Sequence, residues 1–144
     1  MLKEAVEQCP DDQWAKEGDS RSFWKIAYHT LYFTHLYLQA TEADFGKWFW
    51  DKARRDAENV WGDGVQMPPY TKAETLEYWT AVDGMVDSQI DALDLDSQET
   101  GFHWYTMPKL DHVIMNIRHI QEHTGQLRER LIQAGGDPRW IGRA

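Results

Sequence analysis

Residues 108–136 read PKLDHVIMNIRHIQEHTGQLRERLIQAGG and predict one long helix. Pro108 suits the first turn of a helix, and Gly135-Gly136 suits its end. With about 100° of turn for each residue, one face carries the apolar positions Val113, Ile117, Ile120, Thr124, Leu127 and Leu131. We therefore expect this face to pack against other helices in a common core.

Three histidines lie along the edge of that apolar face, at positions 112, 119 and 123, together with Asn116. His119 and His123 are four residues apart, one turn on the same side of the helix. This spacing lets two imidazoles reach one metal ion. Such a pair also arises often by chance, so a metal site needs a further ligand from another part of the chain.

The stretch from Ser22 to about Ala40 predicts a second helix and supplies that ligand. Its core-facing stripe consists of Phe23, Ile26, Ala27, Thr30, Phe33, Thr34 and Tyr37. His29 lies on the margin of this stripe, whereas His35 points elsewhere and cannot serve the same ion. The alternative for His29 is a core-edge histidine bonded to a carbonyl. His112 is the reserve ligand, and His103 falls in a loop.

The remaining segments predict two more helices. Residues 1–8 form a short helix before Pro10, and residues 11–20 are polar and turn-like. Residues 41–69 read as a long crossover with one short helix at most. Thr71 and Glu74 form a capping box that opens a helix to about Leu93. Its partly buried positions are Leu76, Trp79, Ala81, Val82, Met85, Val86 and Ile90.

The sequence therefore predicts an all-α protein in which four helices surround one core. This core belongs to a single domain that spans residues 1–144.

Composition excludes several classes of function. The chain has 144 residues, with 24 acidic against 15 basic side chains and a net charge of −9. An acidic surface without a basic cluster disfavours binding to nucleic acid. No apolar run approaches the ~20 residues of a membrane span. The single cysteine, Cys9, forms no internal disulfide and has no basic partner nearby in the sequence. We expect a cytoplasmic protein that acts on a small molecule.

Three imidazoles would leave coordination positions open, as in catalytic metal sites. Imidazole ligands favour Zn²⁺, Ni²⁺ or Fe²⁺ over Ca²⁺ and Mg²⁺. Such an ion activates a bound water or thiol at neutral pH. Glu122 completes the pattern H-x-x-E-H and is a candidate general base, although a solvated glutamate is the simpler interpretation. Gln126 and Asn116 are candidates to hydrogen-bond the second ring nitrogen of a ligand histidine, and an exposed amide at the helix edge is an equal alternative for Gln126.

Two segments together resemble the DinB/YfiT-like metalloenzyme superfamily. They are SFWKIAYHTL (residues 22–31) and NIRHIQEHTGQL (residues 116–127), of which the ending H-x-x-x-H-x-G-Q is the most specific part. The resemblance implies an up-down-down-up four-helix bundle with a long crossover between helices 2 and 3. It also implies a divalent metal held by His29, His119 and His123, and a homodimer. The first helix is shorter here than is usual for members.

Characterised members include transferases and isomerases that use a low-molecular-weight thiol as cosubstrate. We therefore predict a metal-dependent enzyme that activates a thiol or water against a small electrophile. The alternative is a non-catalytic helical dimer in which the metal site is structural or sensing and the protein binds a ligand or partner. An H-x-x-E-H protease is a third interpretation, for which a small helical bundle offers little substrate cleft.

Overall fold

The computed structural model describes residues 1–45 and 68–140, and this part of the chain is helical without a strand. The elements in chain order are α1 (Leu2–Gln8), α2 (Asp11–Trp14), α3 (Phe23–Tyr37), the 3₁₀-helix η1 (Glu42–Asp44), α4 (Lys72–Ala92) and α5 (Lys109–Gln133). The all-α prediction is confirmed. In the described residues, no helix is both long enough and apolar enough to cross a membrane.

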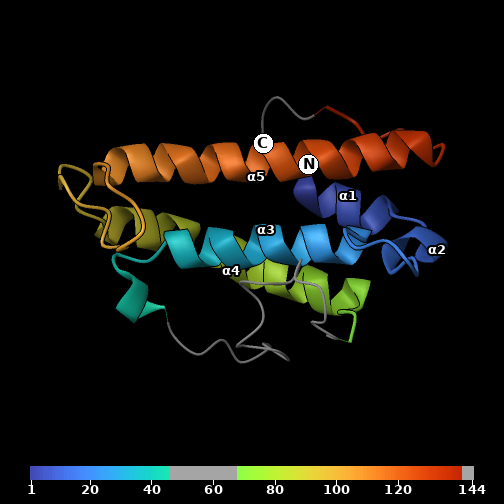
Figure 1. Ribbon diagram of the computed structural model, residues 1–144, viewed down its shortest axis with the longest axis horizontal. Coiled ribbons are helices and arrows are strands. Elements are labelled where there is room, and N and C mark those ends of the chain that lie inside the picture. The colour runs from blue at the N-terminus through green and yellow to red at the C-terminus, as the bar shows by residue number, and fades with distance from the viewer. Residues whose placement is uncertain (46–67, 141–144) are drawn as a thin grey trace.

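Helix α3 lies at the centre of the molecule and packs against α1, α2, α4 and α5 (Figure 1). Its burial is therefore wider than the single stripe that the sequence predicts. Trp24, Tyr28, Leu31, Tyr32 and Leu36 are buried together with most of the predicted stripe. The accessible positions of α3 form one row of half-buried side chains four residues apart: Lys25, His29 and Phe33. His29 thus lies on the one row of the central helix that reaches solvent.

The colours of Figure 1 show that α3 and α4 run in the same direction, while α1 and α5 run in the opposite one. Helix α1 contacts both α4 and α5. It is only seven residues long, so it accompanies the C-terminal half of α5 and, among the described residues, does not extend along the N-terminal half (Figure 1). Residues 11–14, predicted as turn-like, form the short helix α2, because Trp14 is buried and donates to the carbonyl oxygen of Tyr70.

The start of α4 is the predicted capping box. The Thr71 hydroxyl accepts from the Glu74 backbone at 3.2 Å, and the Glu74 carboxylate accepts from the Thr71 backbone at 2.8 Å. The partly buried positions predicted for α4 are confirmed. Val82 is fully buried, and the others are half-buried because α4 lies at the edge of the molecule: Leu76, Trp79, Ala81, Met85, Val86 and Ile90. The hydrophobic pattern missed Thr75 and Tyr78, which are fully buried.

The buried face of α5 is rotated from the predicted one towards the histidines. His112 and Asn116 are buried, whereas Ile117 is 61% exposed and Val113 and Ile120 are half-buried. The reason is that α3 packs on the histidine side of α5. The predicted core positions Thr124, Leu127 and Leu131 are buried, since both α1 and α3 cover the C-terminal half.

A buried lysine fixes the start of α5 against the end of α3. Lys109 is 4% exposed, and its ammonium donates to the carbonyl oxygens of Ala40, at 2.7 Å, and Thr100. Gly101, with φ +80°, brings its backbone against Ala40, where a Cβ would clash with the carbonyl oxygen. Of the predicted crossover, η1 and the residues just before α4 are described, and residues 46–67 lie outside the described part.

Candidate metal centre

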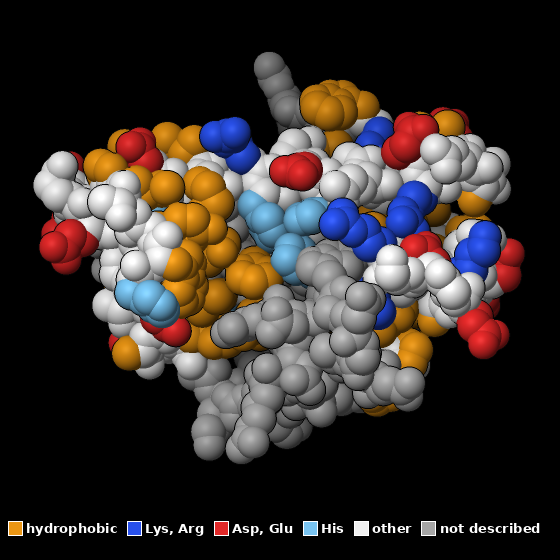
Figure 2. Space-filling model, in the orientation of Figure 1, with side chains coloured by type: hydrophobic (Ala, Val, Ile, Leu, Met, Phe, Trp, Pro, Cys, Tyr) orange, Lys and Arg blue, Asp and Glu red, His pale blue; other side chains and the backbone are white. Residues whose placement is uncertain are grey.

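The packing of α3 against α5 brings together the three histidines that the sequence selects. One ligand nitrogen from each of His29, His119 and His123 lies within 4.8 Å of the other two. All three side chains are half-buried. A group of histidine side chains is visible on the surface at the middle of the face in Figure 2. The cluster is therefore enclosed on its inner side and accessible from solvent.

The spacing of the nitrogens suits a transition-metal ion. The Nε2 atoms of His29 and His119 are 3.2 Å apart. Two ligands at ~2.05 Å from a tetrahedral zinc ion are separated by about 3.3 Å. The ring of His123 packs edge-on against both, with centroids 4.8 Å from His29 and 4.6 Å from His119. The donor set is nitrogen only, which excludes a site for hard cations such as Ca²⁺.

The protonation of the cluster also favours metal binding. Burial, together with smaller contributions from the charges of His123, His119 and Arg21, lowers the pKa of His29 to about 3. Burial lowers the pKa of His119 to about 4, with a smaller contribution from His123. Both rings are therefore neutral at pH 7 and carry a lone pair, the form in which histidine binds a metal.

Gln126 fixes the orientation of His123. Its Oε1 lies 3.0 Å from His123 Nδ1. An amide oxygen only accepts, so Nδ1 carries the proton and Nε2 keeps the lone pair. Asn116, the other predicted supporting residue, is buried between α5 and α3, and its Nδ2 donates to the carbonyl oxygen of Thr34 at 3.4 Å.

Two aromatic side chains of α3 contact the clustered histidines. The Phe33 ring lies 4.7 Å from His29 and 5.8 Å from His119, and the Tyr37 ring lies 6.3 Å from His119. Trp24, Tyr28 and Tyr32 belong to the buried core, and Trp104 is 40% exposed. The spacing of Phe33, one turn after His29, could have identified it.

Glu122 lies beside the cluster on the outside of α5. It is exposed, and it lines a shallow hollow of about 560 Å³ together with Met115, Arg118, His119 and Gln121. His119 thus contacts both the buried interior and this hollow. A small molecule in the hollow would contact the accessible edge of the cluster and the Glu122 carboxylate.

The other described histidines are not in the cluster. The rings of Tyr37, Phe102 and Tyr105 surround His112, the reserve ligand. His35 Nδ1 lies 3.2 Å from the Tyr78 hydroxyl, and exposed His103 pairs with Glu42 at 2.9 Å. These positions agree with the choice of His29 as the third member of the cluster.

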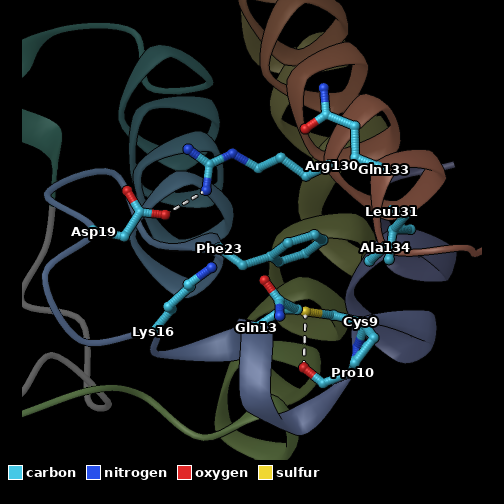
Figure 3. A pocket seen from close by; sticks show the side chains of 10 residues that line it. All are labelled: Cys9, Pro10, Gln13, Lys16, Asp19, Phe23, Arg130, Leu131, Gln133 and Ala134. Atoms are coloured by element: carbon cyan, nitrogen blue, oxygen red, sulfur yellow. Dashed lines mark hydrogen bonds and ion pairs between the residues drawn. The ribbon is translucent and has the colours of Figure 1, made fainter.

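A separate pocket of about 490 Å³ lies between α1, α2 and the ends of α3 and α5 (Figure 3). It contains the Cys9 thiol and an ion pair between Arg130 and Asp19 at 2.7 Å. Cys9 is buried, and burial raises its pKa to about 11. The thiolate is therefore scarce at neutral pH, in agreement with the interpretation of Cys9 as inert.

Comparison with known proteins gives one family. No curated protein and no solved structure matches the chain significantly. The family model described as the DinB superfamily matches residues 1–127, a range that contains all three clustered histidines. The helical fold and the histidine cluster agree with this match, and the chain belongs to the DinB superfamily.

Proposed function

We propose that this protein is a metal-dependent enzyme whose site is formed by His29, His119 and His123. The observation that carries the proposal is the convergence of three half-buried imidazoles from two helices within 4.8 Å. A divalent transition metal (Zn²⁺, Ni²⁺ or Fe²⁺) bound there would supply Lewis acidity and lower the pKa of a water or thiol. The reaction class is thiol transfer to, thiol-dependent isomerisation of, or hydrolysis of a small electrophile.

We assign separate roles to the residues around the cluster: positioning a ligand, shielding it from water and transferring a proton. Gln126 holds His123 with its Nε2 lone pair available, and the half-buried ring of Phe33 and the buried ring of Tyr37 shield the histidines from water on their side of the cluster. Glu122 is the candidate general base, because its exposed carboxylate and His119 line the same hollow. The thiol would be a small, freely diffusing cosubstrate, since Cys9 lies in a different pocket.

We also propose the finer architecture implied by the family. The opposite directions of α1 and α5 against α3 and α4 support an up-down-down-up bundle with its crossover between α3 and α4 (Figure 1). A cytoplasmic location and a homodimer remain predictions from the sequence.

Elemental analysis of protein purified without a histidine tag tests the proposal directly. We expect about one equivalent of a transition metal in the wild-type protein, and loss of that metal in His29→Ala. A panel of thiols and electrophiles then tests activity, which should depend on the metal. Protein that contains no metal, and binds none after incubation with Zn²⁺ or Ni²⁺, would contradict the proposal.

A non-catalytic metal site is the second candidate, because the hollow beside His119 is lined by side chains of α5 alone and is shallow. The two candidates differ in their response to metal removal. If chelation sharply lowers the unfolding temperature, and no substrate in the panel is turned over, the metal is structural or sensing.

A further inference from the structure

A line of buried polar atoms continues from the histidine cluster into the interface between α3 and α5. His112, Asn116 and His119 follow each other on the same side of α5, at spacings of four and three residues. His112 is completely buried and Asn116 is 4% exposed. Within the described part of the chain, no hydrogen-bond partner exists for His119 Nδ1, Asn116 Oδ1 or either ring nitrogen of His112. Buried polar groups without partners are rare and need an explanation.

The orientation of the Asn116 amide follows from its neighbour. Its nitrogen faces the carbonyl oxygen of Thr34, which can only accept a hydrogen bond. The amide oxygen must therefore point away from Thr34. The Thr34 hydroxyl does not reach it either, because this hydroxyl donates to the carbonyl oxygen of Thr30 at 2.6 Å. Asn116 Oδ1 is left as an acceptor that needs a donor.

His119 presents the matching donor. Its Nε2 faces His29 Nε2 at 3.2 Å, so a ligand role for Nε2 requires the proton to reside on Nδ1. That Nδ1 is buried and needs an acceptor, and the nearest turn of α5 carries the acceptor Asn116 Oδ1. The Tyr37 ring packs against both His112, at 4.8 Å, and His119, at 6.3 Å, so one wall of α3 encloses the whole line.

We propose that Asn116 is a positioning residue for His119 and acts through one enclosed water molecule. The water accepts from His119 Nδ1–H, donates to Asn116 Oδ1, and makes its third bond to a ring nitrogen of His112. Three polar partners are the usual number for a buried water. This arrangement holds His119 in the tautomer that presents Nε2 to the cluster, as Gln126 does for His123. The inference rests on the proposed metal-binding function.

Two substitutions of similar size separate positioning from packing. Asn116→Leu removes the acceptor, and Asn116→Asp keeps it. Two measurements are made on each variant: the tautomer of His119 in the metal-free protein, by nitrogen-15 NMR of the imidazoles, and the affinity for Co²⁺, with its visible spectrum. Thr124→Val is the matched control, since Thr124 is a buried polar residue on α5 outside this line.

We expect Asn116→Leu to lose the Nδ1–H preference of His119 and to bind Co²⁺ about 10–100-fold more weakly, with an altered spectrum. Its unfolding temperature without metal should change little, because loss of the long Nδ2 bond to the Thr34 carbonyl oxygen, at 3.4 Å, is offset by replacing an acceptor without a protein partner by an apolar group. Asn116→Asp should keep the tautomer and the affinity, and Thr124→Val should resemble the wild type.

The inference would be overturned if Asn116→Leu keeps both the Nδ1–H tautomer of His119 and the wild-type affinity for Co²⁺. A fall in unfolding temperature without a change in either would show that Asn116 only packs. If Asn116→Leu does not fold, His112→Phe removes the third partner of the water inside an aromatic environment and should weaken Co²⁺ binding in the same direction. If the wild type binds no metal, the proposed function fails, and the NMR measurement still decides whether Asn116 positions His119.

Discussion

The Nε2 atoms of His29 and His119 lie 3.2 Å apart, although the two residues are separated by 90 positions in the chain. Their proximity comes from the packing of α3 on α5 and not from a local turn. Both side chains project from helices whose neighbouring residues, such as Thr30 and Leu127, are fully buried. The packed core therefore fixes the spacing of the candidate ligands. The site is largely pre-organised before a metal ion binds.

Removing the amide of Gln126 should weaken metal binding without removing a ligand. Because Gln126 Oε1 fixes the tautomer of His123, we expect Gln126→Ala to lower the Zn²⁺ affinity about 10-fold to 100-fold. His123→Ala should lower it more, since a ligand itself is lost. Competition with a chromogenic chelator measures both. The control is Gln121→Ala, an exposed amide on the same helix, and an equal loss in this variant would contradict the assignment.

Glu122→Gln tests the general base. The side chain is exposed, so folding and metal content should not change. If the enzyme adds water, the turnover number should fall about 10²–10⁴-fold because the base is lost. A thiol transfer in which the thiol is activated by the metal alone should be little affected. Loss of metal from this variant would show that the carboxylate is a ligand and would contradict the proposed role.

The sequence predicts the site better than it predicts the packing around it. The spacing of His119 and His123 and the motif around His29 are local signals, and these side chains do converge. The face of α5 that the sequence predicts to be buried is rotated away from the observed one, because the isoleucines define the predicted face. Ile117 is 61% exposed, while His112 is completely buried. Hydrophobicity alone does not reveal which side of a helix a central neighbour such as α3 will cover.

The position of Lys109 shows a second limit of prediction from sequence. Nothing in its local pattern distinguishes it from an exposed lysine. Its burial depends on two carbonyl oxygens, Ala40 and Thr100, that arrive from the end of α3 and from the loop before α5. The close approach at Gly101 brings those segments together. Such a contact depends on tertiary structure and becomes visible only when the helices are assembled.

Lys109→Met should destabilise the protein by about 2–4 kcal/mol. The variant removes hydrogen bonds from a charged donor, each worth roughly 1.5–3 kcal/mol, and leaves the carbonyl oxygens of Ala40 and Thr100 without that donor. Urea unfolding at constant pH, in the presence of a chelator, measures the change. Lys16→Met is the control because Lys16 is exposed, and it should change the stability by less than ~0.5 kcal/mol. Equal effects in the two variants would contradict the anchoring role.

The buried histidines predict a loss of stability in mild acid. Burial lowers the pKa of His35 to about 4, from about 6.5 in the unfolded chain. Between these values the unfolded state binds more protons than the folded state, so stability falls as the pH decreases from 6.5 to 4. His35 alone contributes at most about 3 kcal/mol.

His35→Gln can retain a hydrogen bond to the Tyr78 hydroxyl but does not titrate. Its unfolding free energy, measured without metal, should therefore decline less steeply than that of the wild type over this range. The remaining slope comes from His29, His112 and His119, whose pKa values burial also lowers. Parallel curves for the two proteins would contradict this prediction, because they would show that His35 titrates with the same pKa in the folded and the unfolded state.

The uncovered half of α5 predicts self-association of the protein. Leu110, Ile114 and Ile117 are 47%, 47% and 61% exposed and lie at positions i, i+4 and i+7, where α1 is too short to reach. Asp111 and Arg118 flank the same edge of this stripe, seven residues apart. In an antiparallel pair of α5 helices centred between residues 114 and 115, Asp111 would face Arg118 of the partner subunit in two equivalent ion pairs.

Sedimentation velocity tests this arrangement. We expect the wild-type protein to be a dimer and the Ile117→Glu variant to be a monomer. Arg118→Asp should weaken the dimer, and Arg118→Asp combined with Asp111→Arg should restore it, because the charges are only exchanged. A wild-type protein that stays monomeric, or a double variant no tighter than the single one, would show that a different surface or no second copy covers this stripe.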